Sequence, residues 1–197
     1  MSAFSVETPV GTARVHLQQD DVERGLLVLG HGAGRGVQAR DLAAAAGAAR
    51  ANGMGVALVE QPYRVAGRRS PPPAPRLDTA WTAVIASLRD RGLPLVVGGR
   101  SSGARVACRT AAATGAAGVL CLAFPLRPPG GRASRLDELE NVDVPVLVVQ
   151  GSRDPFGIPP ADGLRTVVEV AGDHSLRSDL AAVGAAVGDW LARLLAT

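Results

Sequence analysis

The segment of residues 95–107 limits the possible folds of this chain more than any other part of it. Three apolar residues and two glycines precede Arg100-Ser101-Ser102-Gly103, and an alanine-rich run follows. This order predicts a buried strand that turns sharply into a helix. The stretch Gly99-Arg100-Ser101-Ser102-Gly103 matches G-x-S-x-G, a strained turn that exposes a nucleophilic serine. Counting from Ser102 would put arginine and alanine at the glycine positions, so we predict Ser101 as the nucleophile.

A nucleophilic serine needs a base, which is usually a histidine. The chain has three histidines. His16 lies in an alternating segment typical of an edge strand, where a surface histidine is expected. His31 directly follows an apolar strand. In chains with this turn the triad runs serine, acid, histidine, and His174 is the one histidine after Ser101, so we predict it as the base.

The acid is expected at a strand end between Ser101 and His174. Asp154 follows the predicted buried strand 146–150 and precedes Pro155. We predict it as the residue that orients His174, although a turn former or helix N-cap is the alternative interpretation. Three competing aspartates, Asp137, Asp143 and Asp162, do not follow a strand. The fourth, Asp173, adjoins His174 in the sequence and is expected to be a loop residue.

Residues 30–34, with the sequence Gly-His-Gly-Ala-Gly, follow the first fully apolar strand. Glycines at alternate positions allow the main chain to turn tightly. We expect the backbone N–H groups of Ala33 and Ser102 to form an oxyanion hole. The alternative is a phosphate-binding turn, but G-x-G-x-x-G is absent.

Two proline-rich connections, 60–75 and 123–131, are expected to leave the sheet at the edge where the triad lies. These connections, the turn at Ser101 and the segment 30–34 supply the predicted substrate-binding side chains. Arg64, Arg68 and Arg69 form the one dense basic run, which is either solvated or attracts an anionic group. The predicted substrate-binding residues are His31, Tyr63, Arg100, Phe124 and Leu126.

Composition excludes several classes of function. The 197 residues are sufficient for one domain, residues 1–197, and 3% aromatic residues offer few rings for stacking on bases. With a net charge of only +3, we expect no nucleic-acid partner. No apolar leader or membrane-length apolar run is found, so we expect a cytoplasmic protein without membrane contact. Cys108 and Cys121 are expected to be buried thiols, and we expect no metal and no cofactor.

Periodicity predicts alternating strands and helices, which is typical of an α/β fold with a mostly parallel sheet covered on both faces. The serine, the aspartate and the second histidine all fall at strand ends, where open α/β sheets place their sites. No segment is left for a cap domain. The expected strands are 4–7, 12–17, 26–29, 55–59, 95–98, 118–122, 146–150 and 165–170; the expected helices are 37–52, 77–91, 102–114, 159–164 and 176–196.

The chain resembles a small, capless α/β-hydrolase family related in outline to dienelactone hydrolase. That family includes bacterial predicted hydrolases and animal proteins described as testis-expressed or as subunits of a histone acetyltransferase complex. The resemblance implies an α/β-hydrolase fold and a Ser-His-Asp triad; Ser101 stands where dienelactone hydrolase has a cysteine. The matching segments are 30–34, 61–63 with 68–69, 98–103, 124–126 with 128–130, 150–157 and 172–175.

Two hypotheses follow for function. The first is a serine hydrolase that acts on a small ester, thioester or related acyl compound. The second is a hydrolase-fold interaction module whose triad is idle and whose partner is a protein.

Overall fold

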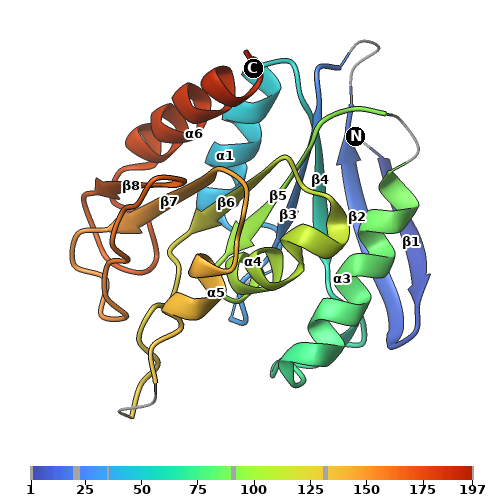
Figure 1. The fold of residues 1–197 in the computed structure, drawn as a ribbon. Coiled ribbons are helices and arrows are strands. Elements are labelled where there is room, and N and C mark those ends of the chain that lie inside the picture. The colour runs from blue at the N-terminus through green and yellow to red at the C-terminus, as the bar shows by residue number, and fades with distance from the viewer. Residues whose placement is uncertain (1, 20–22, 35, 90–91, 131–132, 197) are drawn as a thin grey trace.

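The computed structural model describes residues 2–19, 23–34, 36–89, 92–130 and 133–196 (Figure 1). Its centre is one eight-stranded sheet in the order β1-β2-β4-β3-β5-β6-β7-β8. β1, β2 and β4 pair antiparallel, and the other pairs are parallel. The predicted eight-stranded, mostly parallel sheet is therefore confirmed. The strands are β1 (Ser2–Thr8), β2 (Gly11–Gln18), β3 (Leu26–Gly30), β4 (Gly55–Glu60), β5 (Leu95–Arg100), β6 (Gly118–Leu122), β7 (Val146–Gly151) and β8 (Arg165–Val170).

Helices cover both faces of the sheet (Figure 1). α1 and α6 pack together on one face, and α3 packs against α4 on the other, with α5 beside α4. No helix in the described ranges is long and apolar enough to cross a membrane. The helices are α1 (Arg40–Ala51), α2 (Pro62–Val65), α3 (Ala74–Leu88), α4 (Ser102–Thr114), α5 (Leu136–Glu140) and α6 (Leu180–Leu194).

The central strands are apolar on both sides, and this forms two cores. Val97 of β5 points into the core beneath α3 and α4, whereas its neighbour Val96 points into the core beneath α1 and α6. Side chains alternate between the faces of a strand, so a strand covered by helices on both faces needs a continuous apolar run. This explains why β3 and β5 were recognisable from the sequence.

The helices differ from the prediction at three places, and in addition α6 begins at Leu180 rather than at the predicted residue 176. α2 and α5, one turn or little more each, were not predicted. Residues 159–164 were predicted as a helix but form none. Pro159 and Pro160 offer no backbone N–H, and the Asp162 carboxylate accepts the N–H groups of Leu164 and Arg165, which makes an Asx turn instead. Arg91 and Gly131, the predicted ends of a helix and a loop, lie outside the described residues.

The turn from β5 into α4 depends on close contact with β3. A Cβ atom at Gly99 or at Gly103 would overlap the backbone of Gly30. The two glycines therefore let β5 and α4 pack directly on the backbone of β3.

Replacing Gly99 with alanine should lower the free energy of unfolding by about 1–3 kcal/mol, because the added methyl group forces strand β3 away from the turn. Urea unfolding of the purified protein measures this. Gly47→Ala is the matched control, since Gly47 is exposed on α1 with open space around it. That change should raise stability by about 0.5–1 kcal/mol. Equal free energies of unfolding for the two variants would contradict a tight packing of Gly99 against β3.

Candidate active site

Ser101 lies at the turn between β5 and α4 in a strained backbone conformation. Its φ is 52° and its ψ −106°, in a region that residues with a Cβ atom rarely adopt. Its N–H donates to the carbonyl of Leu122 on β6 at 2.9 Å, which holds the turn against the sheet. The Ser101 Oγ lies 3.0 Å from Nε2 of His174.

The His174 ring is held from its other side by Asp154. Nδ1 of His174 lies 2.8 Å from Oδ2 of Asp154, and the ring of Phe156 packs edge-on with its centroid 4.5 Å away. When Nδ1 carries the proton and donates it to the carboxylate, Nε2 is free to accept a proton from Ser101. The structure thus brings together the three residues predicted from the sequence.

Gln150 at the end of β7 holds the Asp154 loop, and the sequence analysis missed it. Its Nε2 donates to Oδ2 of Asp154 at 2.8 Å and to the Phe124 carbonyl at 3.0 Å, while its Oε1 accepts the Phe124 N–H at 2.9 Å. Asp154 Oδ1 also accepts the N–H of Phe156 at 2.9 Å. The available signal was a glutamine at the end of an otherwise apolar strand, since a buried amide needs partners.

The loop after β3 lies directly beside Ser101. A Cβ atom at Gly32 would be 3.6 Å from the Cβ of Ser101. Ala33 and Ser102 are both half-buried, and Ser102 is the first residue of α4, where N–H groups lack a helical acceptor. Of the two predicted oxyanion-hole residues, Ala33 therefore lies in the loop that passes Ser101 at Gly32, and Ser102 begins the helix that follows Ser101.

His31 fixes this loop from within the protein. Its side chain is only 3% exposed. Nδ1 lies 2.9 Å from the Gly32 carbonyl, and Nε2 is 3.2 Å from the Gln61 nitrogen, whose N–H it accepts. Both bonds require the neutral ring with its proton on Nδ1. Burial lowers the pKa of His31 below 6.5, and the charge of Arg64 lowers it further. His31 was predicted to bind substrate, but these contacts make it part of the loop's internal support.

Arg100 also turns inward rather than toward an open pocket. Its Nε lies 2.8 Å from Oδ2 of Asp41 on α1, and its Nη2 donates to the His174 carbonyl at 2.8 Å. Burial raises the pKa of Asp41, and the charge of Arg100 opposes that rise. The predicted substrate-binding guanidinium is thus engaged by the protein, and it joins α1, the nucleophile turn and the histidine loop.

The three predicted apolar pocket residues occupy different places. Phe124 and Leu126 are buried in the core beneath α3 and α4, so their side chains do not form an open wall. Their loop folds back because Gln150 holds Phe124 by both backbone groups. Tyr63 is largely buried too, with its ring centroid 5.8 Å from that of His31, and it lines a separate cavity near α2.

The remaining candidate side chains have structural partners. His16 on β2 contacts Glu60 on β4, with 2.5 Å between Nε2 and Oε1. Cys108 and Cys121 are buried free thiols. The Asp173 carboxylate accepts the N–H and the hydroxyl of Ser175, as expected of a loop residue. Across the described ranges, no three His, Cys, Asp or Glu side chains gather in a way that could hold a metal ion.

The chain is similar to known hydrolases in sequence and in fold. Residues 23–183 match the family described as the alpha/beta hydrolase domain. No curated protein matches the sequence. The fold is similar to that of Est1E from Butyrivibrio proteoclasticus, with a TM-score of 0.82 and 15% identity over 100% of both chains.

Two further solved structures are similar. XC6422 from Xanthomonas campestris, described as a serine hydrolase without lid, has a TM-score of 0.81 and 21% identity over 100% of this chain and 95% of that chain. Dienelactone hydrolase from Anabaena variabilis has a TM-score of 0.76 and 16% identity over 98% and 96% of the two chains. At these identities the likeness concerns the fold.

The lowered pKa of His31 predicts a pH dependence of stability. The unfolded chain binds a proton at His31 below about pH 6.5, whereas the folded protein does so only at lower pH. Stability should therefore fall as the pH drops below 6.5, by up to about 1.4 kcal/mol per pH unit from this group. His31→Gln keeps an acceptor without titrating, so urea unfolding between pH 5 and 8 should show a smaller fall for the variant. Parallel stability curves would contradict this prediction.

Proposed function

Because this chain belongs to the alpha/beta hydrolase domain family and is therefore a hydrolase, we propose that it cleaves small esters, thioesters or related acyl compounds through an acyl-enzyme on Ser101. One observation carries the proposal: an unbroken chain of contacts from Ser101 through His174 to the buried Asp154. Nucleophile, base and orienting acid at these distances are the requirement for nucleophilic catalysis by serine.

In the first half-reaction, Ser101 Oγ attacks the carbonyl carbon of the substrate and its proton passes to His174 Nε2. The tetrahedral intermediate then collapses, and His174 gives the proton to the departing alkoxide or thiolate. In the second half-reaction, water attacks the acyl-enzyme while His174 takes its proton, and the acid leaves as Ser101 recovers its hydrogen. Asp154 remains ionised and stabilises the imidazolium in both steps.

The developing oxyanion would be held by the N–H groups of Ala33 and Ser102. This assignment is supported by the position of Gly32 beside Ser101 and of Ser102 at the start of α4, where the helix dipole also favours negative charge. His31 and Arg100 act indirectly, since they hold the loops on which these groups lie. Removing one such donor typically slows turnover by about 100-fold or more.

Labelling with a fluorophosphonate probe tests the nucleophile. The wild-type protein should be labelled covalently, and Ser101→Ala should not be, because only an activated serine hydroxyl displaces fluoride from the probe and becomes phosphonylated. Ser102→Ala is the matched control for a neighbouring hydroxyl and should retain labelling. No label on folded wild type would favour the alternative, an interaction module with an idle triad. In that case a protein partner should be recovered equally by wild type and Ser101→Ala.

The absence of a cap domain from the described residues predicts a preference for short acyl groups. A long acyl chain would lie partly in water and gain little of the roughly 0.8 kcal/mol available per buried methylene. With p-nitrophenyl esters from acetate to laurate, kcat/KM should stop rising after the first few carbons, with Ser101→Ala giving the background rate. A steady rise to laurate would refute the prediction and indicate a deep apolar channel.

A further inference from the structure

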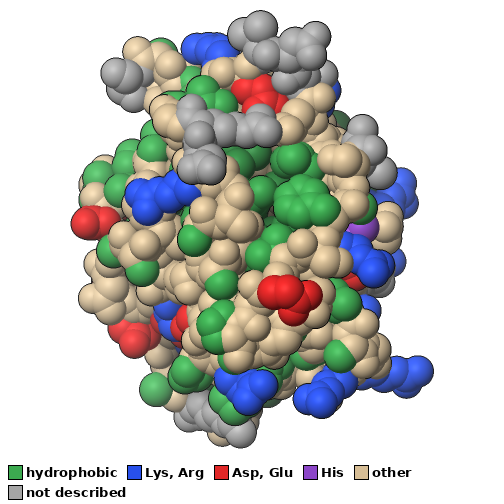
Figure 2. Space-filling view, turned by 90° about the vertical axis from the view of Figure 1, so that its right-hand side faces the viewer, with side chains coloured by type: hydrophobic (Ala, Val, Ile, Leu, Met, Phe, Trp, Pro, Cys, Tyr) green, Lys and Arg blue, Asp and Glu red, His purple; other side chains and the backbone are tan. Residues whose placement is uncertain are grey.

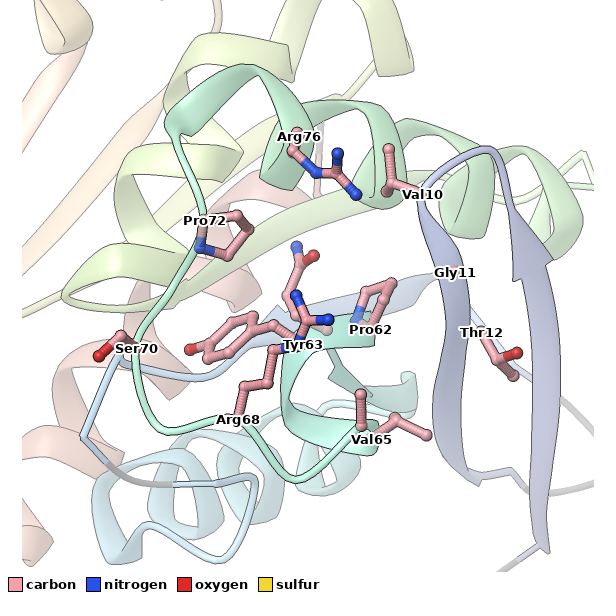
Figure 3. Close-up of a pocket in the computed structure, with 12 residues that line it drawn as sticks. Val10, Gly11, Thr12, Pro62, Tyr63, Val65, Arg68, Ser70, Pro72 and Arg76 are labelled. Atoms are coloured by element: carbon pink, nitrogen blue, oxygen red, sulfur yellow. The ribbon is translucent and has the colours of Figure 1, made fainter.

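A cavity of about 460 Å³ lies away from the catalytic residues, at the edge of the sheet that begins with β1 (Figure 3). The turn between β1 and β2 forms one side of it, α2 forms another, and the proline-rich segment leading into α3 closes the third. Its apolar lining consists mainly of Val10, Pro62, Tyr63, Val65 and Pro72. The cavity is therefore large enough and apolar enough to take the body of a small organic molecule.

Two arginines extend into this cavity from different segments. Arg68 follows α2 and Arg76 lies in the first turn of α3, and Figure 3 shows both side chains pointing toward the space over Pro62 and Tyr63. In the part of the chain that the structure describes, neither guanidinium forms an ion pair with a carboxylate. Figure 2, which faces the β1 side, shows several basic side chains along the lower edge of the molecule. Two converging positive charges repel one another unless an anion lies between them.

The cavity is distinct from the catalytic centre. Ser101, Asp154 and His174 are not among its lining residues. Gln61 and Tyr63 line it on the side nearer to His31 and Ser102, because they also line a much smaller cavity with those two residues. This side is fixed: the Gln61 side chain donates to the Leu77 carbonyl at 3.2 Å. A ligand could therefore occupy the cavity without displacing the catalytic residues.

We propose that this cavity binds a small molecule that carries one carboxylate on an apolar body. The guanidinium groups of Arg68 and Arg76 receive the carboxylate, since a planar guanidinium matches its two oxygens. Tyr63 and the prolines cover the apolar part. An inorganic anion such as phosphate is a poorer match, because the apolar walls would remove its water without replacing the lost hydrogen bonds. An acidic side chain, Glu7, touches the rim only through the hydroxyl of Thr12, and it does not line the cavity.

Isothermal titration calorimetry with phenylacetate tests the proposal. Phenylacetamide is the uncharged control ligand of nearly the same shape. The Ser101→Ala protein should bind phenylacetate with the same affinity as the wild type. It should bind phenylacetamide at least tenfold more weakly than it binds phenylacetate. Arg68→Gln and Arg76→Gln, each made in the Ser101→Ala background, should each weaken phenylacetate binding by about fivefold or more.

Arg69→Gln is the matched control variant, because it removes one positive charge beside Arg68 from a residue that does not line the cavity. It should change the affinity less than twofold, and thermal unfolding should show that all three variants remain folded. Three results would overturn the proposal: no binding at millimolar phenylacetate, equal binding of the amide, or an equal effect of Arg69→Gln. Since the measurement uses a protein without the Ser101 hydroxyl, its outcome is independent of whether the triad turns over.

Discussion

The backbone contact between β3 and the two glycines that flank the Ser101 turn is the constraint on which the rest of the candidate site depends. Gly99 and Gly103 leave no room for a side chain against Gly30. The turn between them can therefore be sharp enough to hold Ser101 at a φ of 52°, and the same contact places the loop after β3 beside the hydroxyl. A strained residue of this kind persists only when its surroundings determine it fully. Here these surroundings are three adjacent strands and the start of α4.

Buried polar contacts hold the loops that this sheet cannot hold by itself. Gln150 fastens the Asp154 loop and the Phe124 backbone, and the Arg100 side chain links Asp41 on α1 to the carbonyl of His174. Burying a polar side chain without a hydrogen-bond partner costs free energy, whereas a fully hydrogen-bonded buried network is rigid. Both sets join segments that are far apart in the sequence. The distances among Ser101, His174 and Asp154 thus depend on side chains whose contacts are with the protein itself.

The strands could be predicted from the sequence, and so could the three residues Ser101, Asp154 and His174 that the structure brings together, whereas the contacts that hold the loops could not. An apolar run followed by glycine marks a buried strand end locally, so Ser101, Asp154 and His174 were identifiable from chain order and spacing. The role of Arg100 depends on Asp41, about sixty residues earlier, and no local pattern reveals that pairing. Phe124 and Leu126 were predicted to face the substrate because they follow a strand. Their loop instead folds into the core, which depends on the partner Gln150.

This division explains why the reaction class is easier to infer than the substrate. Reaction chemistry needs a few residue types at strand ends, and the sheet fixes those positions relative to one another. Recognition of the parts of a substrate away from the reacting bond depends on loops. The contacts that set the paths of these loops differ among proteins that share the same fold. In this chain the segment between β4 and α3 shows the principle clearly. It contributes Gln61 to the support of His31 on one side, and on the other it supplies Tyr63 and Arg68 to a cavity with a charge pattern of its own. One segment therefore supports His31 on one side and lines the proposed binding cavity on the other, so substitutions in it are expected to alter that cavity without touching Ser101, Asp154 or His174.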